Sequence, residues 1–195
     1  PDYSAVFPGG EDSHFRIQVP QTLQNQLRGA KRKGHFDGVA TVIIRLIKII
    51  KPEKLILGEK DWQQLIIIRK LFQELSIPIR IESFATQRDQ SGFAYSSRNA
   101  YLSDSERVNA QALPNVIQDA KDNFSKEKII SLQKIESKLK HSNLQIEYIK
   151  IVDAFSLEEK ENIKGICLLA AAVRCGSTRL IDHTFLMHRK PIIAI

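Results

Sequence analysis

Two short polar segments of this sequence carry residue types that could bind the phosphates of a nucleotide. The first, Gly58-Glu59-Lys60-Asp61, follows the apolar run 55–57, and the second is Tyr95-Ser96-Ser97-Arg98-Asn99. Glycine lets a ligand approach the backbone, lysine supplies a mobile positive charge, and hydroxyls beside a guanidinium can surround phosphate oxygens. Taken alone, each segment is more typical of a solvated turn or a helix cap than of a phosphate site. A phosphate site is favoured only if the fold brings the two segments together.

A βαβ unit would provide that joint placement. The apolar run 55–57 is typical of a parallel strand covered on both faces, residues 61–75 have a helical pattern, and residues 79–84 predict the next strand. Parallel strands end at the same edge of a sheet, and ligands bind there. We therefore expect one shared triphosphate site at this edge, between Leu57 and Asn99.

The residues before this unit predict elements that support it. Residues 15–19 alternate with period two and predict an edge strand, and residues 21–29 predict a helix. Apolar residues recur at i, i+3 and i+4 from Val39 to Ile50, which predicts a helix of about a dozen residues with one buried face.

The remainder of the sequence predicts a small α+β unit, separated from the first part near residues 99–103. Ser103 and Glu106 have the spacing of a capping box, and Pro114 should kink or split the helix that they open. The further expected elements are a helix at 126–140, a strand at 144–151, and a β-hairpin formed by 165–173 and 178–185 around Gly176.

The composition excludes several classes of protein. With 195 residues and 43% hydrophobic content, the chain can bury one substantial core or two small ones. Basic residues interrupt its most apolar stretch, 42–57, so no run reaches the roughly 18 residues of a membrane-spanning helix. Cys167 and Cys175 lack metal-ligand spacing and suit reduced thiols. We expect a cytoplasmic protein without a membrane segment or a metal site of its own.

The net charge of +7 could indicate nucleic-acid binding. However, acidic residues are interleaved with the basic ones, and the densest basic cluster, 28–33, has no aromatic residues for stacking bases. A site for a small polyanion such as ATP explains the charge equally well, and we expect no nucleic-acid partner.

The polar segments belong to a longer series of motifs. In chain order these are Leu27-Arg28-Gly29, Arg32-Lys33-Gly34-His35-Phe36-Asp37-Gly38-Val39, Gly58-Glu59-Lys60-Asp61-Trp62-Gln63-Gln64-Leu65, Ser96-Ser97-Arg98-Asn99 with Tyr101-Leu102, and Thr178-Arg179-Leu180-Ile181-Asp182. The series resembles the pantothenate synthetase family over nearly the whole chain. Residues 189–195, a basic linker and an apolar run, resemble the first strand of a cytidylate kinase, as in the bifunctional pantoate ligase/cytidylate kinase form; an ordinary edge strand or tail explains that run equally well.

The resemblance implies an α/β fold in which a partial Rossmann-like nucleotidyltransferase domain with a parallel sheet precedes a small α+β carboxyl-terminal domain. The first would occupy residues 1–99 and the second residues 100–188, with a linker and the start of a possible cytidylate kinase domain at 189–195. The resemblance also implies a homodimer.

The implied reaction has two steps. The carboxylate of pantoate attacks the α-phosphorus of ATP to give pantoyl adenylate and pyrophosphate, and the amine of β-alanine then displaces AMP. Charge builds on phosphorus and on the departing pyrophosphate, so preorganised cations and dipoles lower the barrier more than a proton-transfer residue would. Mg²⁺ would be held mainly by ATP oxygens and water.

The resemblance assigns roles to individual residues. Lys60, Ser96, Ser97 and Arg98 would bind phosphates and carry catalysis; Gly58 and Asp61 would hold ribose; Gln87 would face adenine through its backbone; Glu59 and Tyr95 would complete the ATP site; Gln64 would bind pantoate; and Arg32 and His35 would lie near the pocket.

The sequence departs from the family pattern in two ways. It lacks the family's amino-terminal His-x-Gly-His turn and the Phe-Val-Asn-Pro segment. We therefore expect that an amino-terminal portion of the same protein is missing here, and that this chain holds half of the active site and is inactive alone. Tyr95 stands where the family usually carries methionine or leucine. Two alternatives stay open: another adenylyl-transferring enzyme of the same fold, which would not need Gln64 or the loop 32–38, and a non-catalytic basic binding module.

Overall fold

The computed structural model describes residues 1–187, and contacts within the chain divide it between residues 85 and 86. This division falls earlier in the chain than the boundary expected near residues 99–103. Residues 86–99 group with the second unit because Phe93 is buried in its hydrophobic core and Arg88 forms an ion pair with Asp182. The apolar run 189–195 lies outside the described residues.

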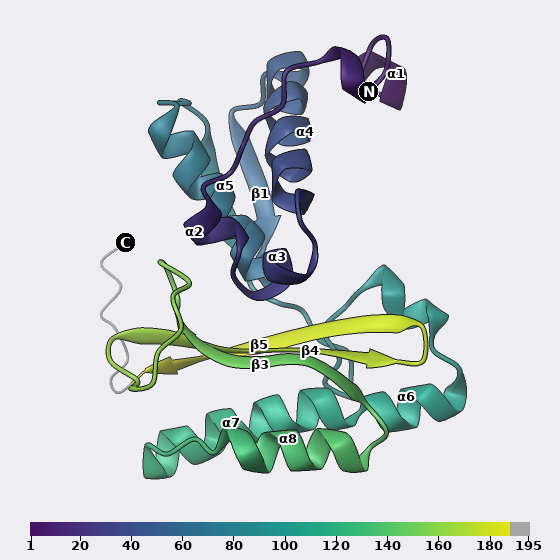
Figure 1. Cartoon of the computed structure of the whole chain (residues 1–195), viewed down its shortest axis with the longest axis vertical. Coiled ribbons are helices and arrows are strands. Elements are labelled where there is room, and N and C mark those ends of the chain that lie inside the picture. The colour runs from purple at the N-terminus through teal and green to yellow at the C-terminus, as the bar shows by residue number, and fades with distance from the viewer. Residues whose placement is uncertain (188–195) are drawn as a thin grey trace. The chain divides into compact units, whose positions relative to one another are not determined.

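The first unit contains the expected βαβ arrangement. Strand β1 (Lys54–Gly58) pairs in parallel with β2 (Arg80–Phe84), and α5 (Trp62–Glu74) connects them. Figure 1 shows α5 and the preceding helix, α4 (His35–Ile50), running beside β1. Their apolar side chains form one core with the inner face of the sheet, namely Ile47, Ile68 and Phe72 with the partly buried Val39, Ile43, Ile44, Leu55, Leu57, Leu71, Ile77, Ile79 and Ile81.

The other face of this sheet is exposed. The side chains of Ile56 and Phe84 are 64% and 59% accessible, whereas Leu55 and Leu57 pack into the core. Successive strand residues point to opposite faces, so a core on one side leaves every second residue uncovered. The expectation that β1 is covered on both faces is therefore wrong for the residues described.

The segment before α4 differs from its prediction. Residues 15–19 form no strand, because side chains of α4 take their amides: Ile17 N donates to Thr41 Oγ1 (2.9 Å) and Val19 N donates to Asp37 Oδ1 (2.7 Å). The expected helix 21–29 is two short helices. Residues 25 and 26 separate them, and Leu27, the first residue of the second helix, has a positive φ of 42°. The short elements here are α1 (Tyr3–Val6), the 3₁₀ turn η1 (Glu11–Ser13), α2 (Gln21–Gln24) and α3 (Leu27–Lys31).

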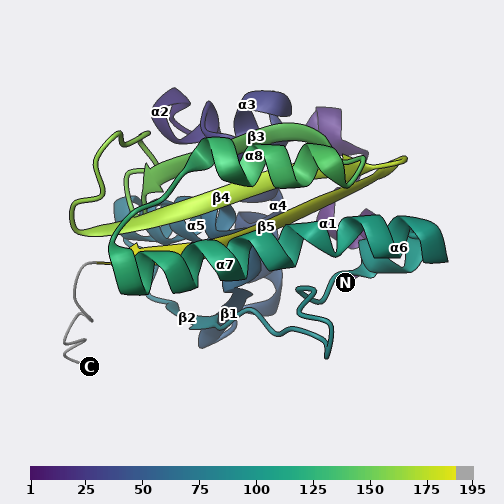
Figure 2. The same cartoon turned by 90° about the horizontal axis from the view of Figure 1, so that it is seen from below.

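The second unit is the expected α+β unit. Its antiparallel sheet has the order β3-β4-β5, with strands β3 (Gln145–Asp153), β4 (Ile166–Cys175) and β5 (Thr178–Met187). Its helical elements are the 3₁₀ helix η3 (Ser97–Tyr101), α6 (Asp104–Ala110), α7 (Ala112–Glu127) and α8 (Leu132–His141). Figure 2 shows α7 and α8 lying along one face of the sheet.

Local signals in this unit account for its helix boundaries. Ser103 and Glu106 form the predicted capping box at the start of α6. The helix is split at Gln111, which separates α6 from α7, and Pro114 lies in the first turn of α7, where its missing amide costs no hydrogen bond. The next helix begins at Leu132, later than predicted. Within residues 1–187 no helix has both the length and the apolar character needed to cross a membrane.

The capping box generates a prediction about Gly176 in the β4–β5 turn. Gly176 has a φ of +55°, and a Cβ there would collide with Glu106 Oε1. We expect Gly176→Ala to lower the free energy of unfolding by about 1–3 kcal/mol, measured by urea denaturation. The matched control is Gly38→Ala in α4, where a Cβ meets no atom within 4 Å and stability should be unchanged or higher. Equal stability of the two variants would contradict this account.

Candidate functional site

The predicted segment 58–61 lies where β1 passes into α5. The strand ends at Gly58, the 3₁₀ turn η2 (Glu59–Asp61) follows, and α5 begins at Trp62. The side chain of Asp61, the residue before α5, does not cap the helix. The amino-terminal end of a helix carries a partial positive charge, so this strand end suits an anion.

Asp61 is held by an ion pair. Arg28 Nη1 in α3 lies 2.9 Å from Asp61 Oδ1, and the two side chains are 12% and 35% exposed. A nearly buried guanidinium fixes the orientation of this carboxylate. Because a carboxylate can accept about four hydrogen bonds, Asp61 retains capacity for other donors, such as ribose hydroxyls.

The neighbours of Asp61 occupy different environments. Ser83 Oγ at the end of β2 donates to Glu59 Oε1 (2.8 Å), so Glu59 links the two parallel strands. Lys60 and Gln64 are both half-buried. At Gly58, φ is −74° and an added Cβ would meet no atom within 4 Å. Neither backbone conformation nor packing requires glycine there, whereas close approach of a ligand would.

Gln63 is a residue that the sequence analysis did not single out. Its side chain is 5% exposed, and its amide is fully used: Nε2 donates to the carbonyls of Leu23 (2.9 Å) and Gln26 (2.8 Å), and Oε1 accepts from the amides of Arg28 (3.0 Å) and Gly29 (3.4 Å). One buried amide therefore attaches α2 and α3 to the first turn of α5. Gln63 stands in one of the quoted family motifs, but neither the motif nor its position in a run of buried helix residues predicted this role.

Residues of the segment 32–38 line a cavity within the first unit. Arg32 is exposed at the end of α3, and His35 is the first residue of α4. The cavity has a volume of about 780 Å³, and its lining includes His35, Arg16, Asp37 and Thr41. Neither Lys60 nor Gln64 lines this cavity, so a role of His35 near the ATP pocket stays a prediction.

The predicted residues Ser96, Ser97 and Arg98 open η3 in the second unit. Arg98 N donates to Ser96 Oγ (3.3 Å), which makes Ser96 the cap of this turn. The ring of Tyr95 is 64% exposed, and its amide donates to the carbonyl of Gln87 (3.0 Å). The segment therefore has a defined backbone, with the serine hydroxyls and the guanidinium on one short turn.

The two halves of the predicted phosphate site belong to different units. Lys60 and its neighbours lie in the first unit, and Ser96, Ser97 and Arg98 lie in the second. Their joint action on one triphosphate therefore stays a prediction.

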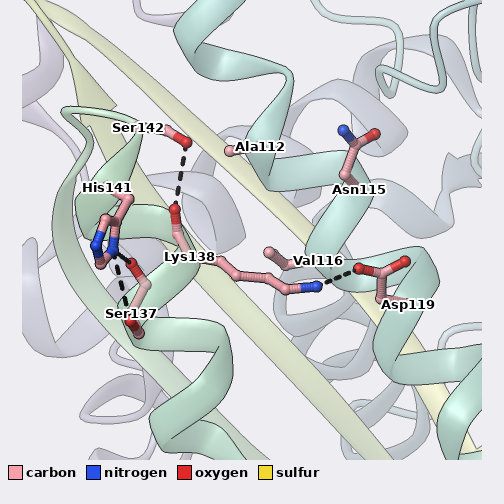
Figure 3. Close-up of a pocket in the computed structure, with 8 residues that line it drawn as sticks. All are labelled: Ala112, Asn115, Val116, Asp119, Ser137, Lys138, His141 and Ser142. Carbon is pink, nitrogen blue, oxygen red and sulfur yellow. Dashed lines mark hydrogen bonds and ion pairs between the residues drawn. The ribbon is translucent and has the colours of Figure 1, made fainter.

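A groove between α7 and α8 is a separate feature of the second unit (Figure 3). Its volume is about 370 Å³. Two of its polar side chains have partners within the groove: Lys138 Nζ lies 2.7 Å from Asp119 Oδ2, and His141 Nδ1 lies 2.7 Å from the backbone carbonyl oxygen of Ser137. No residue of the predicted site lines it.

Comparison with known proteins gives a consistent result. The pantoate-beta-alanine ligase family matches residues 1–185. A bifunctional pantoate ligase/cytidylate kinase from Prochlorococcus marinus (strain NATL1A) is 78% identical over 195 residues, which are 100% of this chain and 38% of that protein. The chain thus spans well under half the length of this relative.

Solved structures show the same similarity. A pantothenate synthetase from Thermus thermophilus superposes with a TM-score of 0.85 at 29% identity, over 96% of this chain and 68% of that one. A pantoate-beta-alanine ligase from Francisella tularensis, solved with beta-gamma ATP and beta-alanine, superposes with a TM-score of 0.74 at 30% identity, over 93% and 61% of the two chains. These neighbours carry the Rossmann-like nucleotidyltransferase fold that the sequence predicts.

The hydrogen bonds of Gln63 generate a stability prediction. Gln63→Leu would take the side-chain acceptor from the amides of Arg28 and Gly29 and a donor from two carbonyls, so we expect the free energy of unfolding to fall by roughly 2–4 kcal/mol. The control is Gln73→Leu, at an exposed position of the same helix, where the change should stay within about 0.5 kcal/mol. Urea denaturation measures both. A Gln63→Leu variant as stable as its control would show that the amide does not hold α2 and α3.

Proposed function

Because this chain belongs to the pantoate-beta-alanine ligase family, we propose that the full-length protein containing it joins pantoate to β-alanine with ATP, through a pantoyl-adenylate intermediate. The observation that carries the proposal is the placement of the segment 58–61 at the carboxyl end of parallel strand β1, directly before α5. That is where nucleotide phosphates bind in open α/β sheets. The beta-alanine bound by the Francisella neighbour supports this choice over another adenylyl transfer.

The chain's own residues would act mainly through charge and position. Lys60, together with the turn 96–98, would bind the triphosphate and stabilise the charge that develops on phosphorus and pyrophosphate. Asp61, already oriented by Arg28, would accept hydrogen bonds from ribose, with Gly58 leaving room for the sugar.

The remaining roles concern the adenine base of ATP and the substrate pantoate. The backbone of Gln87 would face adenine, and the exposed ring of Tyr95 would lie at the edge of that pocket. Gln64 would hydrogen-bond pantoate and hold its carboxylate near the α-phosphorus. Orientation of this kind converts a bimolecular attack into an effectively unimolecular one.

Mg²⁺ would be bound by the nucleotide more than by this chain. Within residues 1–187 no three His, Cys, Asp or Glu side chains gather as a metal site. A small hard cation that keeps most of its waters and binds chiefly to the nucleotide needs no such cluster of protein ligands. When bound, it would neutralise triphosphate charge.

Three further properties belong to the same proposal. The protein would act in the cytoplasm as a homodimer, like the family that it resembles. Cytidylate kinase activity, which the Prochlorococcus relative carries in its name, would reside outside this chain.

Pantoate-dependent exchange of pyrophosphate into ATP tests the proposed reaction. We expect exchange by the full-length protein with pantoate and not with other carboxylic acids, and a loss of roughly 10²–10³-fold in Lys60→Ala and Arg98→Ala. Lys70→Ala, which removes an exposed charge from α5, is the matched control and should retain full activity. Exchange triggered by a different acid would point to another adenylating enzyme.

The incomplete motif set generates a second functional prediction. We expect the purified 195-residue chain to make no pantothenate, because the family's His-x-Gly-His and Phe-Val-Asn-Pro segments are absent and Ile56 and Phe84 leave one sheet face exposed. Adding a separately expressed chain that carries the missing motifs should restore synthesis, assayed by mass spectrometry. Pantothenate formed by residues 1–195 alone would refute this expectation.

A further inference from the structure

A small hairpin immediately precedes the predicted phosphate-binding turn. Arg88 and Ala94 form an antiparallel bridge, and the amide of Tyr95 donates to the carbonyl of Gln87 (3.0 Å). Gly92 closes the tip with a φ of +86°, a conformation that glycine adopts without strain. We call residues 87–95 the leader hairpin; its last residue adjoins Ser96.

Asp89 stabilises the tip of the leader hairpin from within. Its Oδ1 accepts from the amides of Ser91 (2.9 Å) and Phe93 (3.1 Å), and Arg107 Nη2 of α6 lies 2.8 Å from Oδ2. The ring of Phe93 is 4% exposed in the core of the second unit, with the guanidinium of Arg107 5.2 Å from its centroid. These contacts shape the tip and attach it to the helices.

Arg88 attaches the leader hairpin to the sheet. Its Nη1 and Nη2 donate to the two carboxylate oxygens of Asp182 on β5, both at 2.7 Å, and Nη1 also donates to the carbonyl of Gly92 (2.9 Å). The Asp182 side chain is 4% exposed and that of Arg88 is 33% exposed. Hydrogen bonding to Asp182 raises the pKa of Arg88. A forked pair fixes direction as well as distance, which a lysine cannot do.

The leader hairpin in turn sets the position of the phosphate-binding turn. Asn99 Nδ2 donates to the carbonyl of Ala94 (3.0 Å), so the far end of the turn is attached back to the hairpin. The turn 96–98 lies between these anchors, and its own side-chain hydrogen bond, from the Arg98 amide to Ser96 Oγ, stays within the turn. The leader hairpin, which the Arg88–Asp182 pair attaches to β5, therefore helps to fix the location of the turn.

We propose that the Arg88–Asp182 ion pair is a positioning contact for ATP: it holds the leader hairpin on β5 and thereby places Ser96, Ser97 and Arg98 against the phosphates. The inference rests on the proposed function of that turn. Arg88 acts through the hairpin and does not touch the nucleotide. Misplacement of binding groups by about 1 Å can cost roughly 10²-fold in rate, so a contact remote from the chemistry can control it.

The test compares Arg88→Met, Asp182→Leu and the double variant in the full-length protein. Each single change should raise the KM for ATP by at least about tenfold and leave the KM for pantoate within about twofold. Each should also speed hydrogen exchange at the amides of Tyr95 and Asn99. Arg88→Lys retains the positive charge but cannot form the forked pair with Asp182. It should therefore show most of the same rise in the KM for ATP.

The double variant separates positioning from stability. Each single variant leaves one charged group without its ion-pair partner and should lower Tm. The double variant replaces both charged groups by apolar ones and should regain part of that loss. The ATP defect and the fast exchange should nevertheless persist. The control is Arg174→Met, which removes an ion pair with Glu147 in the same sheet and should leave the KM for ATP unchanged.

Two outcomes would contradict the inference. If the double variant recovers the KM for ATP along with its Tm, the pair is merely structural. If Arg88→Met leaves exchange at Tyr95 and Asn99 unchanged, the pair does not hold the hairpin, whatever the activity. An unmodified protein that makes no pantothenate would instead overturn the proposed function, so the two failures are distinguishable.

Discussion

The parallel pairing of β1 with β2 is the constraint on which the candidate site depends. Leu57 lies opposite Ser83 and Gly58 opposite Phe84, so both strands end at the same edge of the sheet. Parallel strands need a crossover, and α5 supplies it while placing its amino-terminal end directly beyond Gly58. The same crossover fixes Lys60, Asp61 and Gln64 around the start of one helix. The core on the inner face of the sheet, centred on Ile68, keeps this geometry in place.

Side chains, more than backbone ladders, hold the loops near the predicted site. Gln63 attaches α2 and α3 to α5, Asp37 accepts from the extended segment before α2, and Asp89 shapes the leader hairpin. Each is a polar group with several partners, Gln63 buried and the two aspartates half-buried, and such a group is costly to leave unpaired. The loops are thereby ordered without extending either sheet. Preorganised loops suit a reaction that depends on placing charges around a phosphate.

Local patterns predicted the elements whose periodicity and flanking residues agree, namely β1, α5, β2, the capping box at Ser103 and the β4–β5 hairpin. They failed where a distant partner decides the outcome. The alternation of apolar and polar residues at 15–19 is the same whether the amides pair with a strand or with α4 side chains. The exposure of Ile56 depends on which elements cover the sheet, which its own sequence does not encode. The motif residues were found through family resemblance. Gln63 and Arg88 were missed because their partners lie elsewhere in the sequence; Arg88 and Asp182 are 94 positions apart.

The central claim is that residues 58–61 and 96–98 bind one and the same triphosphate. Hydrogen exchange of the full-length protein, with and without a non-hydrolysable ATP analogue, tests it most directly. The account predicts that the analogue slows exchange in both segments, with the same dependence on its concentration. Slower exchange in only one segment, or in the two at different concentrations, would contradict it.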